Sequence, residues 1–495
     1  MGESTQLQQK SKSKLKKYII TYVCLAIGFI LIGALTPDNP EEFGPISLIP
    51  AIFLVVYIFW TKRIVESLTL GAVLGYVMVY KWEFFSAFNE MLLGVLMDED
   101  IAWLIIVCGL MGSIIALVEK SGGARAFGEW VATKAKGSRT SMLWTFICSA
   151  LICVDDYLNV LTTGSCMTPI NDRFKIPREM DAYIVDSTAA PACVLNPIST
   201  WGVFIAGLLE ANAVAEKGMG VATYIKSIPF NFYAIAAVAV ELLVIAGVIP
   251  IFGPMKGAWK RVEEGGPLAP PGSEKIDIRA GGAQDVEPFT TPKIINFFLP
   301  ILVLIGSTIA WGLDMQAGVL TTLAFIFVFY VFQGLDPEEF VDEMLRGLKN
   351  MLMPIVMVVL AFSFAAACEE IMFIDYVIDV ATRFMTPQML PFVVFLVFGI
   401  TEFIMGISWG MYIIALPIVI PITLAIGGNP IVTVGAVAAA GTWGSHCCFY
   451  SDATILTSAS TGCDNFRHAI TQIPFGLIAG VVAGIGYLIL GFTMF

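Results

Sequence analysis

Charged side chains are scarce in this sequence. Only 14% of its 495 residues are Asp, Glu, Lys or Arg, whereas 57% are hydrophobic, and the mean hydropathy is +0.81. A water-soluble protein needs a more polar surface than this, and the composition is typical of chains with repeated membrane-spanning helices. The sequence therefore predicts an integral membrane protein, with the lipid bilayer as its first partner.

Signals of several other protein classes are also missing. The sequence has no Walker A pattern, which argues against direct use of ATP, and no nucleophile motif of a hydrolase. Its ten cysteines show neither a CxxC motif nor Cys/His zinc spacing. A net charge of −12 does not indicate nucleic-acid binding. We therefore expect no enzyme activity, no nucleic-acid partner and no bound cofactor.

The two halves of the sequence repeat each other. Residues 88–94 (Phe-Asn-Glu-Met-Leu-Leu-Gly) match residues 341–347 (Val-Asp-Glu-Met-Leu-Arg-Gly). Later in each half, residues 186–188 (Asp-Ser-Thr) correspond to residues 452–454 (Asp-Ala-Thr). Transporters are often built from such repeats, inverted across the membrane, with their sites where helices break near the midplane.

The repeat divides the chain into four parts. We expect an N-terminal tail with an extra transmembrane helix (1–44), a first inverted repeat (45–255), a hydrophilic cytoplasmic linker (256–292) and a second inverted repeat (293–495). The linker is inferred from its Gly, Pro and charged residues, a composition typical of solvated segments.

Inversion requires an odd number of crossings in each repeat. Apolar runs in the first repeat predict crossings at 45–60, 64–80, 101–118, 181–209 and 230–251, so residues 141–170 must form a re-entrant hairpin. The hairpin also keeps the basic loops on the cytoplasmic side, as the positive-inside rule requires. Equivalent features of the second repeat are a hairpin at 391–423 and a broken crossing at 431–461.

The predicted fold is thus an all-α polytopic membrane protein. It has two inverted-topology repeats, each with a re-entrant hairpin and a broken transmembrane helix, and about eleven crossings plus two hairpins. The N-terminus is expected in the cytoplasm and the C-terminus outside it.

Acidic and hydroxyl side chains inside apolar stretches mark the candidate site. Charge at membrane depth is costly and by default marks an ion or substrate path, and broken helices supply further ligands. The candidate ion- or substrate-binding residues are Asp155, Asp156, Asn159, Asp186, Ser187, Thr188, Asn196, Ser199, Trp201, Glu402, Ser408, Trp409, His446, Ser451, Asp452 and Thr454. Because hard oxygen ligands suit a hard cation, Na⁺ is expected at Asp156, Asp186 and Asp452.

Each acid also has a structural interpretation. Asp155 and Asp156 are adjacent and point in different directions, so we expect one to be functional and the other to cap a helix or form an ion pair. Asp186 and Asp452 fit the N-caps of broken segments equally well. His446 is either a proton carrier or a hydrogen-bonded polar residue in the break.

At these residues the chain resembles the NhaC family of Na⁺/H⁺ antiporters, across nearly its whole length apart from the N-terminus and the linker. The motifs that carry the resemblance are residues 155–159, 186–191, 197–202, 408–410, 451–456 and 462–464. The resemblance implies exchange of Na⁺ for H⁺, or in relatives the Na⁺- or H⁺-coupled movement of organic acids or amino acids. It also implies a bacterial inner membrane.

The chain departs from the family pattern in one motif, where it lacks an acid and a proline. Family members commonly read Gly-Asp-His-Cys-Ser-Pro where this chain has Ser445 in place of the acid and Phe449 in place of the proline. The leading hypothesis is a secondary transporter that exchanges Na⁺ for H⁺ by alternating access. The alternative is a Na⁺-coupled carrier of an amino acid or carboxylate, in which the small organic solute replaces H⁺ as partner. Apolar scaffold faces are compatible with a homodimer.

Overall fold

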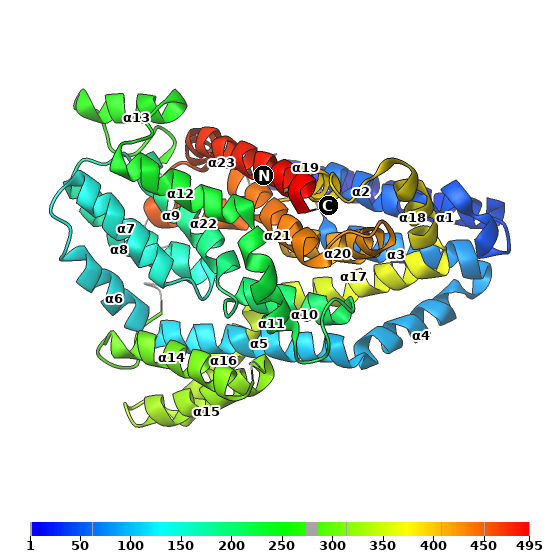
Figure 1. Ribbon diagram of the computed structural model, residues 1–495, viewed down its shortest axis with the longest axis horizontal. Helices are drawn as coiled ribbons and strands as arrows, with labels where there is room; N and C mark the ends of the chain where they lie inside the picture. Colours follow the sequence, from blue (N-terminus) through cyan, green and yellow to red (C-terminus); the bar gives the residue numbers. More distant parts are fainter. Residues whose placement is uncertain are drawn as a thin grey trace. The chain divides into compact units, whose positions relative to one another are not determined.

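The computed structural model (Figure 1) describes residues 2–61, 63–273, 286–312, 314–406, 408–449 and 451–494, and within them every regular element is a helix. The helices form two units. The first contains residues 1–97 and 359–381, and the second contains residues 98–358 and 382–495. The predicted all-α architecture is confirmed.

The first unit is built around the N-terminal helices. They are α1 (Gly2–Leu35), α2 (Ile49–Thr61), α3 (Ile64–Tyr80) and α4 (Phe84–Met97), with 3-10 turns at Pro40–Glu42, Gly44–Leu48 and Lys81–Glu83. The Lys81 ammonium caps the C-terminus of α1, where it donates hydrogen bonds to the carbonyls of Gly33 (2.8 Å) and Thr36 (2.7 Å). A cation at a helix C-terminus satisfies the last carbonyls, which have no partner within the helix.

The second unit holds all of the candidate site residues. Its helices are α5 (Glu99–Lys120), α6 (Gly123–Ala132), α7 (Ser138–Leu151), α8 (Asp156–Arg173), α9 (Arg178–Leu195), α10 (Thr200–Ala211), α11 (Gly220–Ser227), α12 (Phe232–Ala246), α13 (Gly253–Glu263), α14 (Ile295–Ala310), α15 (Met315–Val331), α16 (Pro337–Asn350), α19 (Leu390–Met405), α20 (Ser408–Ala425), α21 (Pro430–Cys447), α22 (Asp452–Thr461) and α23 (Asn465–Met494). Helices α17 (Leu352–Glu370) and α18 (Phe373–Phe384) carry the chain between the two units.

The first predicted hairpin consists of α7 and α8. Its legs are joined near the open end, where the Asn171 amide donates to Thr145 Oγ1 (3.0 Å), and near the tip, where Ser149 Oγ donates to Asn159 Oδ1 (2.8 Å). Residues 152–155 separate the legs. The second hairpin is α19 and α20, and α19 ends at Gly406, whose positive φ of 71° favours glycine.

Both predicted broken crossings are also present. Helices α9 and α10 are interrupted at residues 196–199, which include Pro197, whereas Pro191 lies inside α9; helices α21 and α22 meet at a bend of 44°. A third bend, of 54°, joins residues 220–230 to α12. Each break leaves backbone groups without helical partners at the point where the two halves meet.

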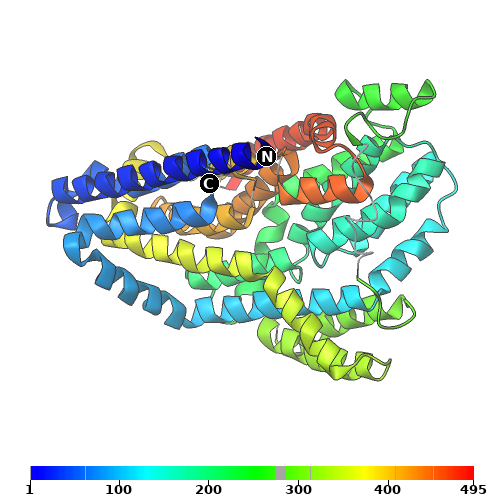
Figure 2. The same cartoon turned by 180° about the vertical axis from the view of Figure 1, so that it is seen from behind.

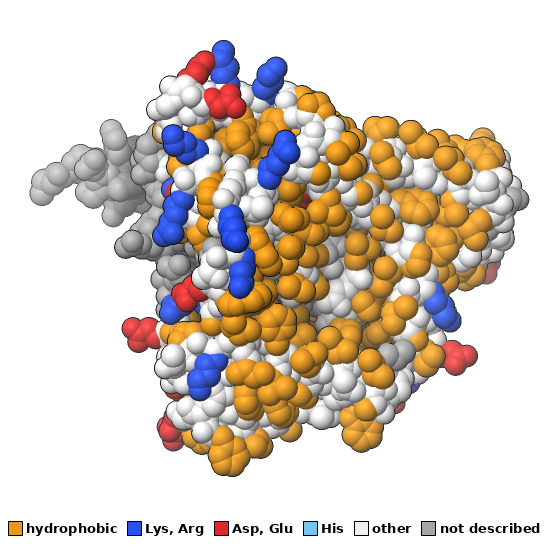
Figure 3. Space-filling view, turned by 60° about the vertical axis from the view of Figure 1, so that its left-hand side comes forward, with side chains coloured by type: hydrophobic (Ala, Val, Ile, Leu, Met, Phe, Trp, Pro, Cys, Tyr) orange, Lys and Arg blue, Asp and Glu red, His pale blue; other side chains and the backbone are white. Residues whose placement is uncertain are grey.

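Length and hydropathy alone make five helices of the described chain able to cross a membrane, or seven if each of the two bent pairs counts as one span. The predicted count of eleven crossings stays a prediction, because shorter apolar helices such as α14 and α15 fall below that length. Figure 3 shows a face covered largely by hydrophobic side chains, with Lys and Arg gathered toward one edge. That distribution suits a protein embedded in lipid with a basic rim.

Part of the predicted linker is folded. Helix α13 begins before it, and Arg261 of α13 forms a two-pronged ion pair with Glu179 at the start of α9, at 2.7 and 2.8 Å. The Arg178 amide donates to the Leu268 carbonyl (3.1 Å), so the following segment also lies against α9. Residues 274–285 of the predicted linker lie outside the described residues.

Helix α16 lies along α5 at very short range (Figure 2). Two glycines face each other at the crossing, and a Cβ atom added to Gly347 would come within 2.2 Å of the Gly112 carbonyl oxygen. Beside them Ser113 Oγ donates to the Met344 carbonyl (2.8 Å), and Arg346 pairs with Glu119 (2.9 Å). Small residues at such crossings let helix backbones approach closely in a membrane.

Replacing Gly347 with Ala is therefore expected to destabilise the protein by about 1–3 kcal/mol, because the new methyl group meets backbone that cannot move aside locally. The measurement is thermal unfolding of the purified protein in detergent. Gly306→Ala in α14 is the matched control, since nothing lies within 4 Å of its added Cβ. Equal melting temperatures for the two variants would contradict the close crossing.

Candidate functional site

Helix α9 carries the centre of the candidate site. This helix is buried along nearly its whole length. The side chains of successive residues on a helix point in directions about 100° apart. The side chains of Asp186, Ser187 and Thr188 therefore point in three different directions. Asp186 contacts α22 and α23, Ser187 contacts α21, and Thr188 contacts α12.

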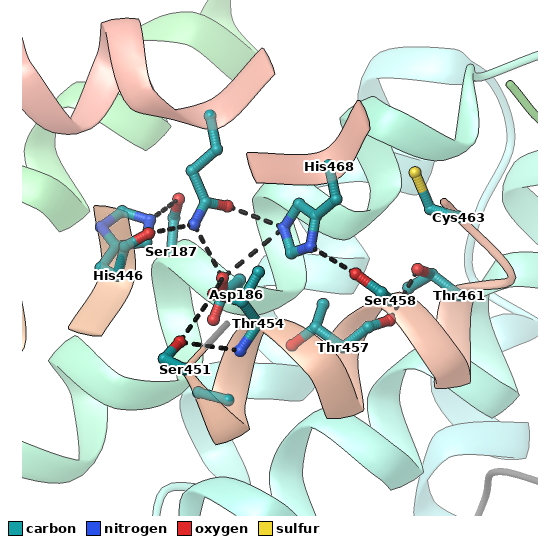
Figure 4. A network of polar contacts seen from close by, with 12 residues as sticks. Asp186, Ser187, His446, Ser451, Thr454, Thr457, Ser458, Thr461, Cys463 and His468 are labelled. Carbon is teal, nitrogen blue, oxygen red and sulfur yellow. Dashed lines mark hydrogen bonds and ion pairs between the residues drawn. The ribbon is translucent and has the colours of Figure 1, made fainter. Parts of the chain in front are cut away.

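The Asp186 carboxylate lies in a network of polar side chains (Figure 4). Its Oδ2 accepts hydrogen bonds from Gln472 Nε2 (2.7 Å) and Thr454 Oγ1 (3.3 Å), and His468 Nε2 is 3.5 Å away. Its Oδ1 is buried and has no hydrogen-bond partner among the described residues. A carboxylate oxygen in that position is open to a cation or a proton.

His446 connects two other elements to the same network. Its Nε2 lies 2.8 Å from Ser187 Oγ and its Nδ1 lies 2.6 Å from the Tyr233 hydroxyl, while its carbonyl accepts a hydrogen bond from Gln472. Figure 4 shows His446 and His468 on opposite sides of Asp186. Both ring nitrogens of His446 are thus engaged, and one of the two hydroxyls must donate to the neutral ring.

The break before α22 brings Ser451, Asp452 and Thr454 to this network. Ser451 caps the helix, since its Oγ accepts from the Thr454 amide (3.2 Å) and lies 2.8 Å from Thr454 Oγ1. Asp452 accepts from the Ala453 amide (3.0 Å) through Oδ1 and from the Tyr157 hydroxyl of α8 through Oδ2. Both oxygens of Asp452 are therefore occupied within the protein.

Asp155 and Asp156 have different surroundings, as their adjacency predicts. Asp155 caps α8, accepting from the Leu158 amide (2.9 Å) and from Thr200 Oγ1 of α10 (3.1 Å). Asp156 is equally buried, at the first turn of α8, but its Oδ1 has no hydrogen-bond partner in the described part of the chain. Asp155 thus fits the structural interpretation and Asp156 the functional one.

Three of the candidates hold the broken backbone in place. Asn159 donates from Nδ2 to the Ser149 carbonyl (2.7 Å), across the first hairpin. Asn196 donates to the Cys153 carbonyl (2.8 Å), which joins the break in α9 and α10 to the hairpin tip. Ser199 caps α10 by accepting from the Gly202 amide (3.0 Å). Their positions explain the sequence motifs without requiring a bound ion.

The remaining candidates lie around the second hairpin. Glu402 is fully buried, and its Oε1 accepts from Ser408 Oγ (3.1 Å), whereas Oε2 has no hydrogen-bond partner within the described residues. Trp409 packs against Trp201 of α10, with ring centroids 5.7 Å apart. The void beside Trp409 holds only about 10 Å³. These aromatic rings close the space between α10 and α20.

The three acids expected to bind Na⁺ do not gather into one cluster. Within the described chain, no group of three or more His, Cys, Asp or Glu side chains lies close enough to hold a metal ion. A Na⁺ ion at any one of Asp156, Asp186 or Asp452 would take its other ligands from hydroxyl, amide and carbonyl oxygens. Such neutral oxygens are acceptable to a hard monovalent cation.

The comparisons with known proteins agree with this architecture. A profile described as the Na⁺/H⁺ antiporter family matches residues 192–492, which is more than half of the chain. The chain belongs to the Na⁺/H⁺ antiporter family. This membership confirms the resemblance inferred from the sequence motifs and makes the protein a secondary transporter of the membrane.

An uncharacterised protein of Haemophilus influenzae is 28% identical over 490 residues, covering 90% of this chain and 91% of that protein. Two solved structures share the fold at 12% identity. The YdaH transporter of Alcanivorax borkumensis, described as having an unusual topology, has a TM-score of 0.56 and covers 88% of this chain and 98% of its own. MtrF of Neisseria gonorrhoeae, described as illuminating a class of antimetabolite efflux pumps, has a TM-score of 0.54, with coverages of 83% and 84%.

The site of this antiporter-family protein contains residues that the sequence analysis did not select. Gln472 and His468 lie one turn apart on α23, and His468 Nε2 is 2.8 Å from Gln472 Oε1. Their i, i+4 spacing in an apolar helix was a usable signal. Tyr157, Tyr233 and Glu241 are further examples, and only the tertiary contacts show what they face.

The cap assigned to Asp155 predicts a difference between two substitutions. Asp155→Asn keeps an oxygen that accepts from the Leu158 amide, so the protein should fold and transport normally. Asp155→Ala removes the cap and should cost about 0.5–2 kcal/mol of stability. Thermal unfolding and transport in liposomes measure both effects. A folded Asp155→Asn protein without transport would show instead that this carboxylate binds the transported ion.

Proposed function

We propose that this protein exchanges Na⁺ for H⁺ by alternating access. The observation that carries the proposal is the Asp186 carboxylate. One of its oxygens accepts hydrogen bonds from Gln472 and Thr454, and the other has no hydrogen-bond partner among the described residues. An anionic carboxylate is costly in a membrane unless a cation or a proton neutralises it. Na⁺ and H⁺ would therefore compete for the same oxygen, which is the basis of exchange.

The elements around Asp186 suit a site that opens to alternate sides. Thr454 belongs to α22, directly after a break, and Gln472 belongs to α23, so three separate helices contribute to one carboxylate. A relative shift of α9 and α22 would exchange the Thr454 contact for water on one side. Broken helices beside the ion are the usual place for such a shift in carriers built from repeats.

Asp156 supports the proposal as a second acidic position. One of its oxygens has no hydrogen-bond partner among the described residues, and it lies at the first turn of α8, at the hairpin tip.

The decisive measurement is transport in proteoliposomes. With a Na⁺ gradient imposed and a trapped dye reporting internal pH, the wild-type protein should move protons against Na⁺. Asp186→Asn and Asp156→Asn should each reduce this movement by about tenfold or more, the effect of roughly 1.4 kcal/mol of lost interaction. The isosteric amides keep the shape of the site, so both variants should elute as folded protein in size-exclusion chromatography.

Two outcomes contradict the proposal. Wild-type proton movement in Asp186→Asn would remove that residue from the mechanism. If no protons move until an amino acid or carboxylate is added, the protein is a solute carrier instead, and a screen of such solutes would identify the substrate class.

We further propose that the protein lies in a bacterial inner membrane with its N-terminus in the cytoplasm and its C-terminus outside. The basis is the distribution of Lys and Arg along the chain, since basic loops stay on the cytoplasmic side. Fusions to the C-terminus test it: alkaline phosphatase should be active there, and green fluorescent protein should be dark. A fluorescent C-terminal fusion would require an even number of crossings.

A further inference from the structure

Glu241 is a fully buried carboxyl group outside the Asp186 network. It lies on α12, which packs against α7, α9, α21 and α23. None of the sequence motifs singled it out. Its two oxygens have unequal surroundings. Oε1 is 2.7 Å from Thr188 Oγ1 of α9, whereas Oε2 is buried and has no hydrogen-bond partner among the described residues.

The Thr188 hydroxyl shows which form of Glu241 fits this arrangement. Its Oγ1 contacts the Ile184 carbonyl at 2.8 Å as well as Glu241 Oε1 at 2.7 Å. A hydroxyl has one hydrogen to donate, and a backbone carbonyl can only accept. If that hydrogen goes to Ile184, the contact with Glu241 needs a hydrogen from the Glu241 carboxyl. Both short contacts are satisfied together when Glu241 is protonated.

The charges around Glu241 agree with a neutral acid. Within the described chain, Glu241 forms no ion pair. Among the described titratable groups, Tyr183 on α9 is the neighbour that interacts with a charge on Glu241. Tyr233 on α12 and His446 on α21 are bonded to each other, and His468 on α23 is engaged with Asp186 and Gln472.

The nearest basic group from α7 is Arg139. It is exposed and lies beside Gly247, past the end of α12. Six residues of helix, about 9 Å, separate Gly247 from Glu241. A buried carboxylate without a cation beside it is strongly disfavoured. The surroundings of Glu241 must therefore change when Glu241 loses its proton.

We propose that Glu241 is a second proton-binding site, distinct from the Asp186 cation site, and that it carries a proton which the transporter exchanges. The inference rests on the proposed Na⁺/H⁺ exchange. Thr188 is two residues from Asp186 on the same helix, so a movement of α9 that follows cation binding at Asp186 also moves the hydroxyl that contacts Glu241. In the open state the carboxyl O–H bond breaks, the proton passes to water on that side, and Thr188 turns to donate to the carboxylate.

The test uses Glu241→Gln, whose amide keeps the size of the side chain and offers Thr188 a hydrogen as the protonated acid does. In proteoliposomes this variant should retain exchange of labelled Na⁺ for Na⁺ and should lose Na⁺-driven proton movement to the level of empty liposomes. A purely structural role would lower both activities in parallel. Glu241→Asp, which restores a titratable group, should recover part of the proton movement.

Glu210→Gln in α10 is the control for removing a buried carboxylate. Both Glu210 oxygens accept backbone amides, from Gly220 (2.6 Å) and Gly218 (3.0 Å), so this group is tied to a loop and its variant should keep proton coupling. Proton movement at the wild-type rate in Glu241→Gln would overturn the proposal, and so would a loss of both activities in that variant alone.

Infrared spectroscopy separates this inference from the proposed function. The wild-type protein in detergent should show the C=O band of a buried protonated carboxyl group that is missing from Glu241→Gln and present in Glu210→Gln. If wild-type liposomes move no protons with Na⁺, the Na⁺/H⁺ proposal fails, and the band alone then decides whether Glu241 holds a proton. An identical spectrum for wild-type and Glu241→Gln would overturn the Glu241 site.

Discussion

The second unit is organised by one constraint, that polar side chains of a buried membrane helix must find their partners inside the protein. Helix α9 shows this most clearly. Water and lipid cannot reach its middle, so each polar residue there needs a neighbour that supplies a donor or an acceptor. The run Asp186, Ser187 and Thr188 meets that need by contacting four other helices, and the positions of α12, α21, α22 and α23 around α9 are fixed by those contacts.

The same constraint governs the broken segments. Where α9 gives way to α10 and α21 to α22, the next helix begins with a serine whose hydroxyl accepts from an amide of the first turn, at Ser199 and at Ser451. Asp155 does the same at the tip of the first hairpin. Capping satisfies the backbone amides that the breaks expose, and it leaves three helix N-termini inside the protein, where they favour negative charge.

The helices and their breaks could be predicted from the sequence more fully than the contacts between side chains. The hairpins and breaks could be predicted from local signals such as Pro197 and Gly406, together with the requirement that basic loops stay on one side of the membrane. The repeated motif at residues 88–94 and 341–347 lies in helices, α4 and α16. Local sequence patterns were therefore enough to predict the helical elements.

The partners within the site could not be predicted in this way. Gln472 reaches Asp186 across 286 residues of chain, and Glu241 meets Thr188 across 53. Neither pairing leaves a spacing in the sequence that distinguishes it from a single polar residue in an apolar helix. The division of roles between Asp155 and Asp156 was expected, but which residue caps α8 depends on the φ and ψ of the turn before it.

Hydrogen bonding divides the buried acids of this unit into two kinds. In one kind both oxygens have donors in the protein; these are Asp155, Glu179, Asp181 and Glu210, with the half-buried Asp452. In the other kind one oxygen has no hydrogen-bond partner among the described residues; these are Asp156, Asp186, Glu241 and Glu402.

An acid of the first kind is complete without any ligand and so fits a structural role. An acid of the second kind has one oxygen left over that a cation, a proton or a water molecule can occupy. Two such acids lie on or beside α9, on opposite faces, so a shift of that single helix changes the surroundings of both. In the proposed exchange the two ions need such a link, and the spacing of Asp186 and Thr188 along α9 would supply it.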